Sequence, residues 1–427
     1  MINIKSACIA IFCSIQLNYG QCLGDANLNY RIDSDDVFLI ADHLLGINQI
    51  ENEGIANSNI NYDNTVNIID LLGLTDLLFI DGYSWCEYEP VDLSLEWQGQ
   101  EDTTYFNHQE LQTILSNDIY SLNYIRGFIV LHRGKIVAEE YFYGSTSAQE
   151  FNIYSVTKSY IATLVGQAID MGFITQPLVT LDSIFYENDY TTQVTLGNLL
   201  SMTSGWPENW YYMYTSNTID MLLGTSLVTN PGDVFFYNNA ACHINSYVLL
   251  EKTGLNPKEF AMEHLFPYLG FDDPYWGMDY DNVSNGSYDL FLSLRDMIKL
   301  GQLYLQDGYS GEEQVISFDW ISEATSNQIP GGGYGYLWWI PESGEYMAIG
   351  YGGQLILVIP ELELVIGTHS LVPSTDAYFN NLVQVIYDQV VPLFDLSGSL
   401  SERYFYKGKI DRISKILNQH ITNPYQQ

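Results

Sequence analysis

Residues 151–174, FNIYSVTKSYIATLVGQAIDMGFI, place a serine and a lysine three positions apart at the start of an apolar segment with helical periodicity. Residues i and i+3 share one face of a helix, so Ser155 and Lys158 are expected to be neighbours. A lysine that is partly desolvated beside a serine can be neutral enough to take the serine's proton. Alone, the spacing is equally compatible with an N-cap serine and a solvated lysine.

Two further segments could complete a catalytic site. The segment PGDVFFYNNAACHINSYVLLE, residues 231–251, opens a second apolar helical pattern with Tyr237 and Asn239. The segment AIGYGGQLILVIP, residues 348–360, places a glycine pair on a predicted strand, where a substrate can lie close to the backbone. His243 follows Asn239 by one helical turn and is interpreted as a structural histidine, and Cys242 as a small buried apolar residue.

Strand patterns at both ends of the larger part of the chain enclose a mostly helical middle. Residues 127–144 predict a β-hairpin that turns at Arg133-Gly134-Lys135. The order of the remaining patterns predicts an α+β sheet domain that carries a helical insertion. These patterns are a helix over 155–172, helical segments over 195–305, strands over 346–369 and a helix over about 376–393.

The S-x-x-K pair, the Y-x-N pair and the glycine-rich strand, in this order, resemble the serine β-lactamase and penicillin-binding superfamily. The resemblance covers roughly residues 105–395 and is strongest to class C β-lactamase-like esterases, D-aminopeptidases and 6-aminohexanoate-oligomer hydrolases. Supporting phrases are VTLGNLLSMTSGW (194–206) and GGQLILVIPELELVI (352–366). The resemblance implies an antiparallel sheet flanked by helices, with a helical insertion.

The resemblance also implies roles for individual residues. Ser155 would be the nucleophile that forms an acyl-enzyme. Lys158 and Tyr237 would share the general-base and general-acid work, and Asn239 would orient Lys158 or the substrate amide. The backbone N–H groups of Ser155 and Gln354 would form the oxyanion hole. No cofactor is implied for catalysis.

The strand motif departs from the family pattern at one position. It reads Tyr351-Gly352-Gly353 where the family has K-T-G or H-x-G. A cation at that place can hold a substrate carboxylate, whereas a neutral tyrosine can only hydrogen-bond. Tyr351 therefore favours esters or amides without that carboxylate, and Gly353 would let them lie near the strand.

Three functions follow from these residues. The first is a secreted serine hydrolase that cleaves a small-molecule or short oligomeric ester or amide. The second is a peptidoglycan-directed D-peptidase or a β-lactamase. The third, from another class, is a non-catalytic binding or scaffold-docking protein that retains the fold. No G-x-S-x-G elbow occurs in the sequence, which argues against an α/β-hydrolase.

The N-terminal part contains a duplicated twelve-residue window. Residues 25–36 read DANLNYRIDSDD and residues 59–70 read NINYDNTVNIID, and each runs into an apolar helical stretch. Side-chain oxygens at alternating positions are the ligands that calcium prefers. The candidate ligands are Asp25, Asn27, Asn29, Asp33 and Asp36 in the first window, and Asn59, Asn61, Asp63, Asn67 and Asp70 in the second.

This duplicated segment resembles a type I dockerin, a small all-α calcium-loop module, over about residues 22–86. The resemblance implies a cohesin-like partner. The second window has Asn59 where an aspartate is usual and so holds two carboxylates against three in the first window. We therefore expect weaker calcium binding at the second window.

The N-terminus is interpreted as an export signal over residues 1–21, because Lys5 precedes the short apolar run SACIAIFCSI. Export makes a disulfide between Cys22 and Cys86 plausible. The net charge of −37 argues against nucleic acid as a partner, and no apolar run is long enough to span a bilayer. The expected organisation is completed by a linker over 87–103, the hydrolase domain over 104–396 and a C-terminal tail over 397–427.

Overall fold

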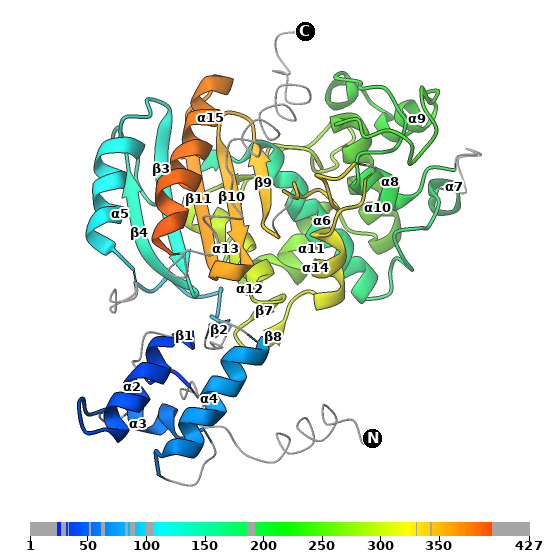
Figure 1. Ribbon diagram of the computed structural model, residues 1–427. Coiled ribbons are helices and arrows are strands. Elements are labelled where there is room, and N and C mark those ends of the chain that lie inside the picture. The colour runs from blue at the N-terminus through cyan, green and yellow to red at the C-terminus, as the bar shows by residue number, and fades with distance from the viewer. Residues whose placement is uncertain are drawn as a thin grey trace, which may run out of the picture. The chain divides into compact units, whose positions relative to one another are not determined.

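The computed structural model divides the chain into two compact units, residues 1–89 and 90–427 (Figure 1). It describes residues 24–26, 31–32, 34–50, 53–60, 65–81, 84–85, 90–99, 106–185, 193–329, 331–341 and 344–394. Within these ranges, no helix is both long enough and apolar enough to cross a bilayer. The predicted signal at 1–21, the tail at 397–427 and both Cys22 and Cys86 lie outside the described residues and stay predictions.

A five-stranded antiparallel sheet organises the larger unit. Its strands follow the order β4-β3-β11-β10-β9. The predicted hairpin is confirmed, because β3 pairs with β4 and Arg133 and Gly134, both at positive φ, make the turn. The strands near the C-terminus were also predicted correctly. The strand bounds are β3 Ile125–His132, β4 Lys135–Tyr141, β9 Tyr346–Gly350, β10 Gln354–Ile359 and β11 Leu364–Ser370.

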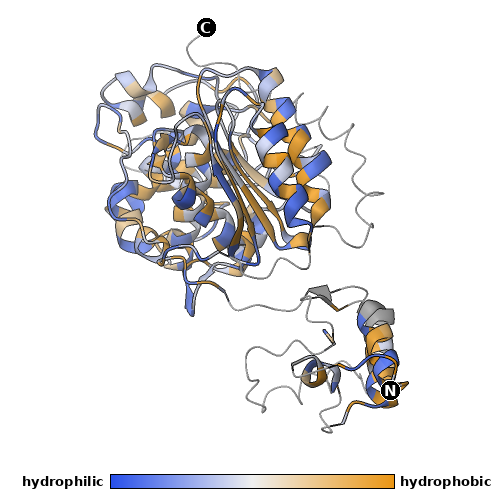
Figure 2. Cartoon of the chain, turned by 90° about the vertical axis from the view of Figure 1, so that its left-hand side faces the viewer, coloured by the Kyte–Doolittle hydropathy of each residue, from blue (hydrophilic) through white to orange (hydrophobic). Residues whose placement is uncertain are grey.

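Every residue of β9, β10 and β11 is buried, because helices cover both faces of the sheet. The helix α13 (Leu294–Leu305) packs against β11, β10 and β3. Figure 1 shows α15 (Asp376–Val385) on the opposite face, and Figure 2 shows the apolar strands between the helical layers. The helix predicted over 376–393 is correct in position, but it continues beyond Val385 as a π-helical turn, Ile386–Val390, and a 3₁₀ turn, Val391–Leu393.

The predicted helical insertion connects the two parts of the sheet. Its helices fold beside α6 (Thr157–Asp170), which packs against α10, α11 and β9. The remaining helices of the unit are α5 His108–Ile114, α7 Leu181–Ile184, α8 Leu196–Leu200, α9 Thr218–Leu223, α10 Asn239–Thr253, α11 Pro257–His264, α12 Phe266–Leu269 and α14 Phe318–Ala324. Two-residue strands pair as β5 (Phe151–Asn152) with β6 (Phe291–Leu292) and β7 (Tyr309–Ser310) with β8 (Glu313–Gln314).

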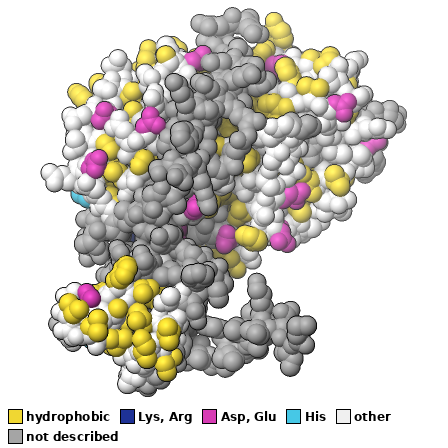
Figure 3. Space-filling view, in the orientation of Figure 1, with side chains coloured by type: hydrophobic (Ala, Val, Ile, Leu, Met, Phe, Trp, Pro, Cys, Tyr) yellow, Lys and Arg dark blue, Asp and Glu magenta, His cyan; other side chains and the backbone are white. Residues whose placement is uncertain are grey.

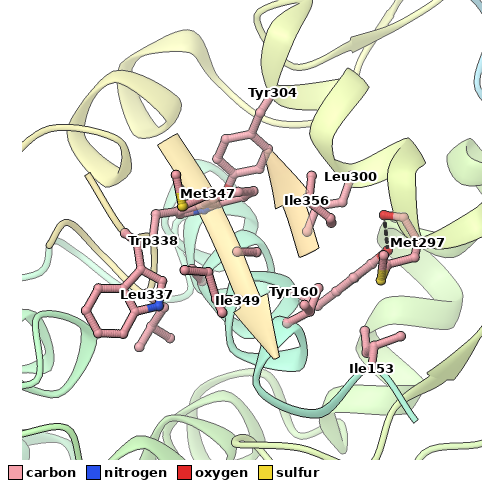
Figure 4. Packing of buried hydrophobic residues seen from close by; sticks show 14 of the residues in the cluster. Ile153, Tyr160, Met297, Leu300, Tyr304, Leu337, Trp338, Met347, Ile349 and Ile356 are labelled. Atoms are coloured by element: carbon pink, nitrogen blue, oxygen red, sulfur yellow. Dashed lines mark hydrogen bonds between the residues drawn. The ribbon is translucent and has the colours of Figure 1, made fainter. Parts of the chain in front are cut away.

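The main core lies between α6, α13 and the sheet (Figure 4). Tyr160 of α6 is fully buried there, and its hydroxyl donates to the carbonyl of Met297 at 3.3 Å. Gly166, two turns further along α6, lies against Trp320, where a Cβ atom would meet the indole ring at 2.4 Å. These contacts fix the position of α6, which carries Lys158 of the candidate site.

The linker predicted over 87–103 is wrong for residues 90–99. Leu93 is buried, and its N–H donates to Ser310 Oγ at 2.9 Å. Trp97 packs against the core, and its indole N–H donates to the carbonyl of Arg295 at 2.8 Å. Although the segment is acidic, its apolar side chains pack on the core and its N–H groups form hydrogen bonds there. Residues 90–99 therefore belong to the larger unit, which begins before the expected residue 104.

The smaller unit contains the two helices predicted after the duplicated windows. They are α2 (Ser34–Leu44) and α4 (Ile68–Asp81), and a short helix α3 (Glu53–Ser58) lies between them in the chain. Among the described residues of this unit, the buried apolar core consists of Ala26, Ile40, Ile50 and Leu74. The expectation of an all-α module is wrong in one respect, because β1 (Arg31–Ile32) pairs antiparallel with β2 (Ser84–Trp85).

Candidate active site

The serine of the S-x-x-K pair lies in a tight turn just before α6. Tyr154, Ser155 and Val156 form a 3₁₀ turn, and Tyr154 adopts a positive φ of 47°. The side chain of Asn152 supports this turn, because its Oδ1 accepts the N–H of Tyr154 at 2.8 Å and its Nδ2 donates to Asp289 at 2.7 Å. The helix predicted over 155–172 therefore begins two residues later, at Thr157, and ends at Asp170.

Lys158 lies on the first turn of α6 and is only 1% exposed. Its Nζ is 3.0 Å from Ser155 Oγ, as the spacing predicted. The same nitrogen donates to Asn239 Oδ1 at 2.8 Å and to the carbonyl of Ser287 at 2.8 Å. The structure thus brings Lys158 together with Ser155 and Asn239, and it adds a backbone carbonyl from a distant loop.

Burial lowers the pKa of Lys158 to about 8, and the nearby Cys242 and Glu208 oppose this change. Moving an ammonium group out of water disfavours its charged form. Cys242 is fully buried on α10, and burial raises its pKa to about 11. The thiol therefore stays protonated at neutral pH, in agreement with its interpretation as an apolar core residue.

Tyr237 is buried beside the same pair. The centre of its ring is 4.9 Å from Lys158 Nζ, and the ring stacks on Trp339 with a centroid distance of 5.7 Å. Burial raises the pKa of Tyr237 above its usual value, and the nearby Ser155 hydroxyl opposes the rise. The phenol is therefore a hydrogen-bond donor at neutral pH.

Asn239 is the first residue of α10, and Asn238 caps this helix by accepting the N–H of Ala241 at 2.8 Å. Glu208 was not identified from the sequence as part of the site. Its carboxylate accepts the backbone N–H of Asn239 at 2.7 Å and the side-chain Nδ2 of Asn239 at 3.2 Å. A glutamate in an aromatic loop carries no local signal for this role.

The loop that contains Glu208, WPENWYYMY over 206–214, is rich in aromatic side chains. Trp206 and Tyr212 are buried in the core, whereas Tyr211 and Tyr214 are exposed. The loop therefore packs on the helical region through some of its aromatic rings and presents others to solvent.

His243 is a satisfied structural residue, as expected. Its Nδ1 accepts the N–H of Gly286 at 3.0 Å, and its Nε2 lies 2.9 Å from Asp279 Oδ2. The hydroxyl of Tyr247 also donates to this carboxylate, at 2.6 Å. These contacts hold the loop at Gly286 in place. The carbonyl of the following residue, Ser287, accepts the hydrogen bond from Lys158 Nζ.

The glycine-rich motif forms the turn between β9 and β10, and it borders the serine turn. The ring of Tyr351 meets that of Tyr154 edge to face at 5.6 Å. Burial and the neighbouring Asp376 raise the pKa of Tyr351, so its phenol is neutral. Gly353 has a φ of 103°, and a Cβ atom there would meet Ser370 Oγ at 2.9 Å, so glycine is required for two reasons.

The side chain of Gln354 faces the neighbouring strand β11. Its Nε2 donates to the carbonyl of Ser370 at 2.8 Å, and its Oε1 accepts the N–H of Ser370 at 3.1 Å. Gln354 therefore fixes the end of β10 through its side chain. The oxyanion role predicted for its backbone N–H remains a prediction.

Half of the candidate calcium ligands lie outside the described residues: Asn27, Asn29, Asp33, Asn61 and Asp63. Asp25 and Asp36 are buried, and Asp36 accepts the N–H of Ala26 at 2.9 Å, which joins the two ends of the first window. Asn67 Oδ1 accepts the N–H of Ile69, near the start of α4, at 2.8 Å. Among the described residues, no three His, Cys, Asp or Glu side chains are grouped closely enough to hold a metal.

Comparison with known proteins agrees with this geometry. The Beta-lactamase family model matches residues 127–381. The chain is 25% identical over 295 residues to the 6-aminohexanoate-dimer hydrolase of Paenarthrobacter ureafaciens, covering 58% of this chain and 73% of the relative.

Two solved structures show the same fold. One is a Bacillus anthracis protein assigned as a 6-aminohexanoate-dimer hydrolase, with a TM-score of 0.58 and 21% identity, covering 74% of this chain and 90% of that one. The other is EstCE1, a hydrolase with promiscuous acyltransferase activity, with a TM-score of 0.54 and 13% identity, covering 65% of this chain and 98% of that one. Because the family model spans more than half of the 427 residues, this chain belongs to the Beta-lactamase family and is a serine hydrolase of the β-lactamase-related superfamily.

Proposed function

We propose that the larger unit cleaves an ester or amide through an acyl-enzyme on Ser155, with Lys158 as general base and Tyr237 as general acid. The observation that carries this proposal is the 3.0 Å approach of Lys158 Nζ to Ser155 Oγ, with Asn239 Oδ1 and the Ser287 carbonyl each 2.8 Å from the same nitrogen. In the neutral amine these two acceptors hold both N–H groups. The remaining lone pair then faces the serine hydroxyl.

The reaction begins when Ser155 Oγ attacks the carbonyl carbon of the substrate and its proton passes to Lys158 Nζ. The resulting oxyanion is assigned to the N–H groups of Ser155 and Gln354. The bond from carbon to the leaving oxygen or nitrogen then breaks, and the leaving group takes a proton from Tyr237, which Lys158 reprotonates. Water then attacks the acyl-enzyme and gives a proton to the same pair; when the bond from carbon to Ser155 Oγ breaks, the pair returns that proton to Oγ and the acid is released.

The division of labour between Lys158 and Tyr237 follows from their opposite responses to burial. Burial lowers the pKa of Lys158 to about 8, so part of its population is neutral near neutral pH. Burial raises the pKa of Tyr237, so its proton is present and available to a leaving group. A general base works best when its pKa lies near the working pH, and the lowered pKa of Lys158 approaches that condition.

The substrate is proposed to be a small or short oligomeric ester or amide without a carboxylate at the position that Tyr351 faces. The neutral phenol of Tyr351 supports this choice over a β-lactam or a D-alanyl peptide. The similarity to a 6-aminohexanoate-dimer hydrolase supports an amide substrate.

Labelling with a fluorophosphonate probe tests the nucleophile independently of the substrate. The full chain should label at one serine, and Ser155→Ala should abolish the label. Ser159→Ala is a matched control, because Ser159 is also buried on α6 but donates to the carbonyl of Leu337. An unlabelled wild-type protein would favour the non-catalytic binding function. A panel of p-nitrophenyl esters, aminohexanoate oligomers, D-alanyl peptides and nitrocefin then separates the hydrolase classes.

The smaller unit is proposed to be a calcium-bound docking module of the dockerin type with a cohesin-like partner. The duplicated windows support this, as does Asn59 Oδ1, which is buried and finds no hydrogen-bond partner among the described residues. A large group of exposed apolar side chains, visible in Figure 3, supports docking onto another protein. These side chains are Phe38, Leu45, Ile47, Ile68, Ile69 and Leu72.

Calcium titration of the full chain tests this second proposal. Two binding events of unequal affinity are expected, with the tighter one at the first window because of its extra carboxylate. Chelation of calcium should lower the folding stability of the smaller unit. It should leave hydrolysis largely intact, because the proposed catalytic groups are a serine, a lysine and a tyrosine. We also propose export through residues 1–21, which N-terminal sequencing of the secreted protein would check.

A further inference from the structure

Glu208 occupies a position between the loop over 206–214 and the start of α10. Its carboxylate accepts four N–H groups: the backbone N–H of Asn239 at 2.7 Å, that of Ala240 at 3.1 Å, that of Asn209 at 2.9 Å and the side-chain Nδ2 of Asn239 at 3.2 Å. The negative charge also lies at the positive end of a 15-residue helix. A buried carboxylate with this many donors is fixed in one orientation.

The contacts of Asn239 link this carboxylate to the reacting pair. Because Nδ2 donates to Glu208, the amide oxygen must face the other way, and there it accepts Lys158 Nζ at 2.8 Å. The reversed amide would place Nδ2 against the amine and Oδ1 against a carboxylate. Both contacts would then be repulsive, so Glu208 selects one orientation of Asn239.

We propose that Glu208 is a positioning residue of the hydrolase site, which acts through Asn239 to aim the lone pair of Lys158 at Ser155 and which sets, by its charge, the pH at which Lys158 becomes a base. The proposal rests on the proposed function of Ser155 and Lys158. It goes beyond that function because Glu208 touches neither reacting group and belongs to a loop that the sequence motifs omit.

The charge effect has a definite sign. The groups that face Lys158 are Glu208 from the aromatic loop, Cys242 from α10 and Tyr237 from the segment before α10, and the last two are neutral at neutral pH because burial raises the pKa of each. Burial raises the pKa of Glu208, while the N–H groups of Asn239, Ala240 and Asn209 and the charge of Lys158 oppose this rise. In its ionised form, Glu208 supplies the negative charge that favours the ammonium form of Lys158. Replacing it with a neutral group should lower the pKa of Lys158.

The test measures the rate of fluorophosphonate labelling of Ser155 against pH in the full chain. Glu208→Gln should lower the limiting rate at high pH by about tenfold, because the amide of Asn239 loses a charge-assisted partner. The same variant should move the midpoint of the pH profile downward by about half a unit or more. Glu259→Gln is the matched control, because Glu259 is an exposed carboxylate that accepts the N–H of Asn256 at the start of α11.

The outcomes separate the two claims. A wild-type protein that does not label refutes the proposed function itself. If the wild type labels and Glu208→Gln has the same pH profile, the positioning role is refuted. A lower limiting rate of Glu208→Gln with an unchanged midpoint also refutes it, because Glu208 would then only cap α10. If Glu208→Gln does not fold, Glu208→Asp keeps the charge but shortens the reach, and it should keep the midpoint while lowering the limiting rate. A wild-type limiting rate in Glu208→Asp would also overturn the proposal.

Discussion

The pH dependence of Ser155 acylation is the sharpest consequence of the buried lysine. Burial lowers the pKa of Lys158 to about 8, from the ordinary lysine value of 10.5. At pH 7 about one lysine in ten is then neutral, whereas an unperturbed lysine would be neutral in fewer than about one molecule in 1,000. Burial therefore enlarges the population of neutral Lys158 at pH 7 by about two orders of magnitude.

The expected profile has a single ascending limb. Because only the neutral amine accepts the serine proton, the acylation rate should rise about tenfold between pH 7 and pH 9 and then level off. Tyr237 should add no descending limb between pH 6 and 10, because burial raises its pKa above the usual tyrosine value.

The second-order rate of fluorophosphonate labelling measures acylation directly. It avoids the pH dependence of deacylation and of leaving-group departure, and the spontaneous hydrolysis of the probe is subtracted at each pH. Lys158→Ala should lower the rate by on the order of a thousandfold at every pH. A flat profile between pH 6 and 10, or a midpoint near the ordinary lysine pKa, would refute Lys158 as the base.

Three further predictions test other parts of the structure. In the native state the pKa of Lys158 lies below its unfolded value, so the unfolded chain binds more protons between about pH 8 and 10.5. The free energy of unfolding of the wild type, measured relative to that of Lys158→Met, should therefore rise with pH. Denaturant titrations should show a rise of about 3 kcal/mol from pH 7 to pH 11. Tyr351→Lys should raise the ratio of nitrocefin or D-alanyl-peptide hydrolysis to simple ester hydrolysis, and an unchanged ratio would mean that Tyr351 does not face the far end of the acyl group. Digestion of the secreted protein without reductant should yield, by mass spectrometry, a peptide pair joined through Cys22 and Cys86, and free Cys86 in fully oxidised material would exclude this disulfide.

The parts of the site that the sequence predicts are those that depend on local geometry. Ser155 and Lys158 are three residues apart, so the first turn of a helix is enough to bring them together. The hairpin of β3 and β4 is equally local, because its turn residues and its alternation of side chains lie within one short segment. Tyr237 and Asn239 were found because they stand at and just before the start of a helix, within a recognisable pattern.

The parts that the sequence does not reveal depend on contacts between distant segments. Glu208 meets Asn239 from 31 residues away, through an arrangement that only the packing of the aromatic loop on the helical insertion creates. Ser287 contributes a backbone carbonyl, and any residue type can supply one, so no side-chain pattern marks it. The segment 90–99 was assigned to a linker from its acidic composition, although Val91, Leu93 and Trp97 alternate as residues do in a chain that packs one face on a core.

The amide of Asn239 lies between two ionisable groups, and this arrangement would let the proposed site use a buried lysine as a base. A carboxylate in direct contact with Lys158 would form an ion pair and hold the amine protonated, which would remove the base. A site without any carboxylate would leave the orientation of Asn239, and hence of the lysine lone pair, undetermined. With Asn239 between them, Glu208 fixes the orientation of the amide by accepting a hydrogen bond from Nδ2, and Oδ1 then accepts one from Lys158 Nζ, so the charge of Glu208 acts on Lys158 only from beyond the amide. The pKa of Lys158 can then stay near 8, where the amine is basic enough to take the serine proton and neutral in a useful fraction of molecules.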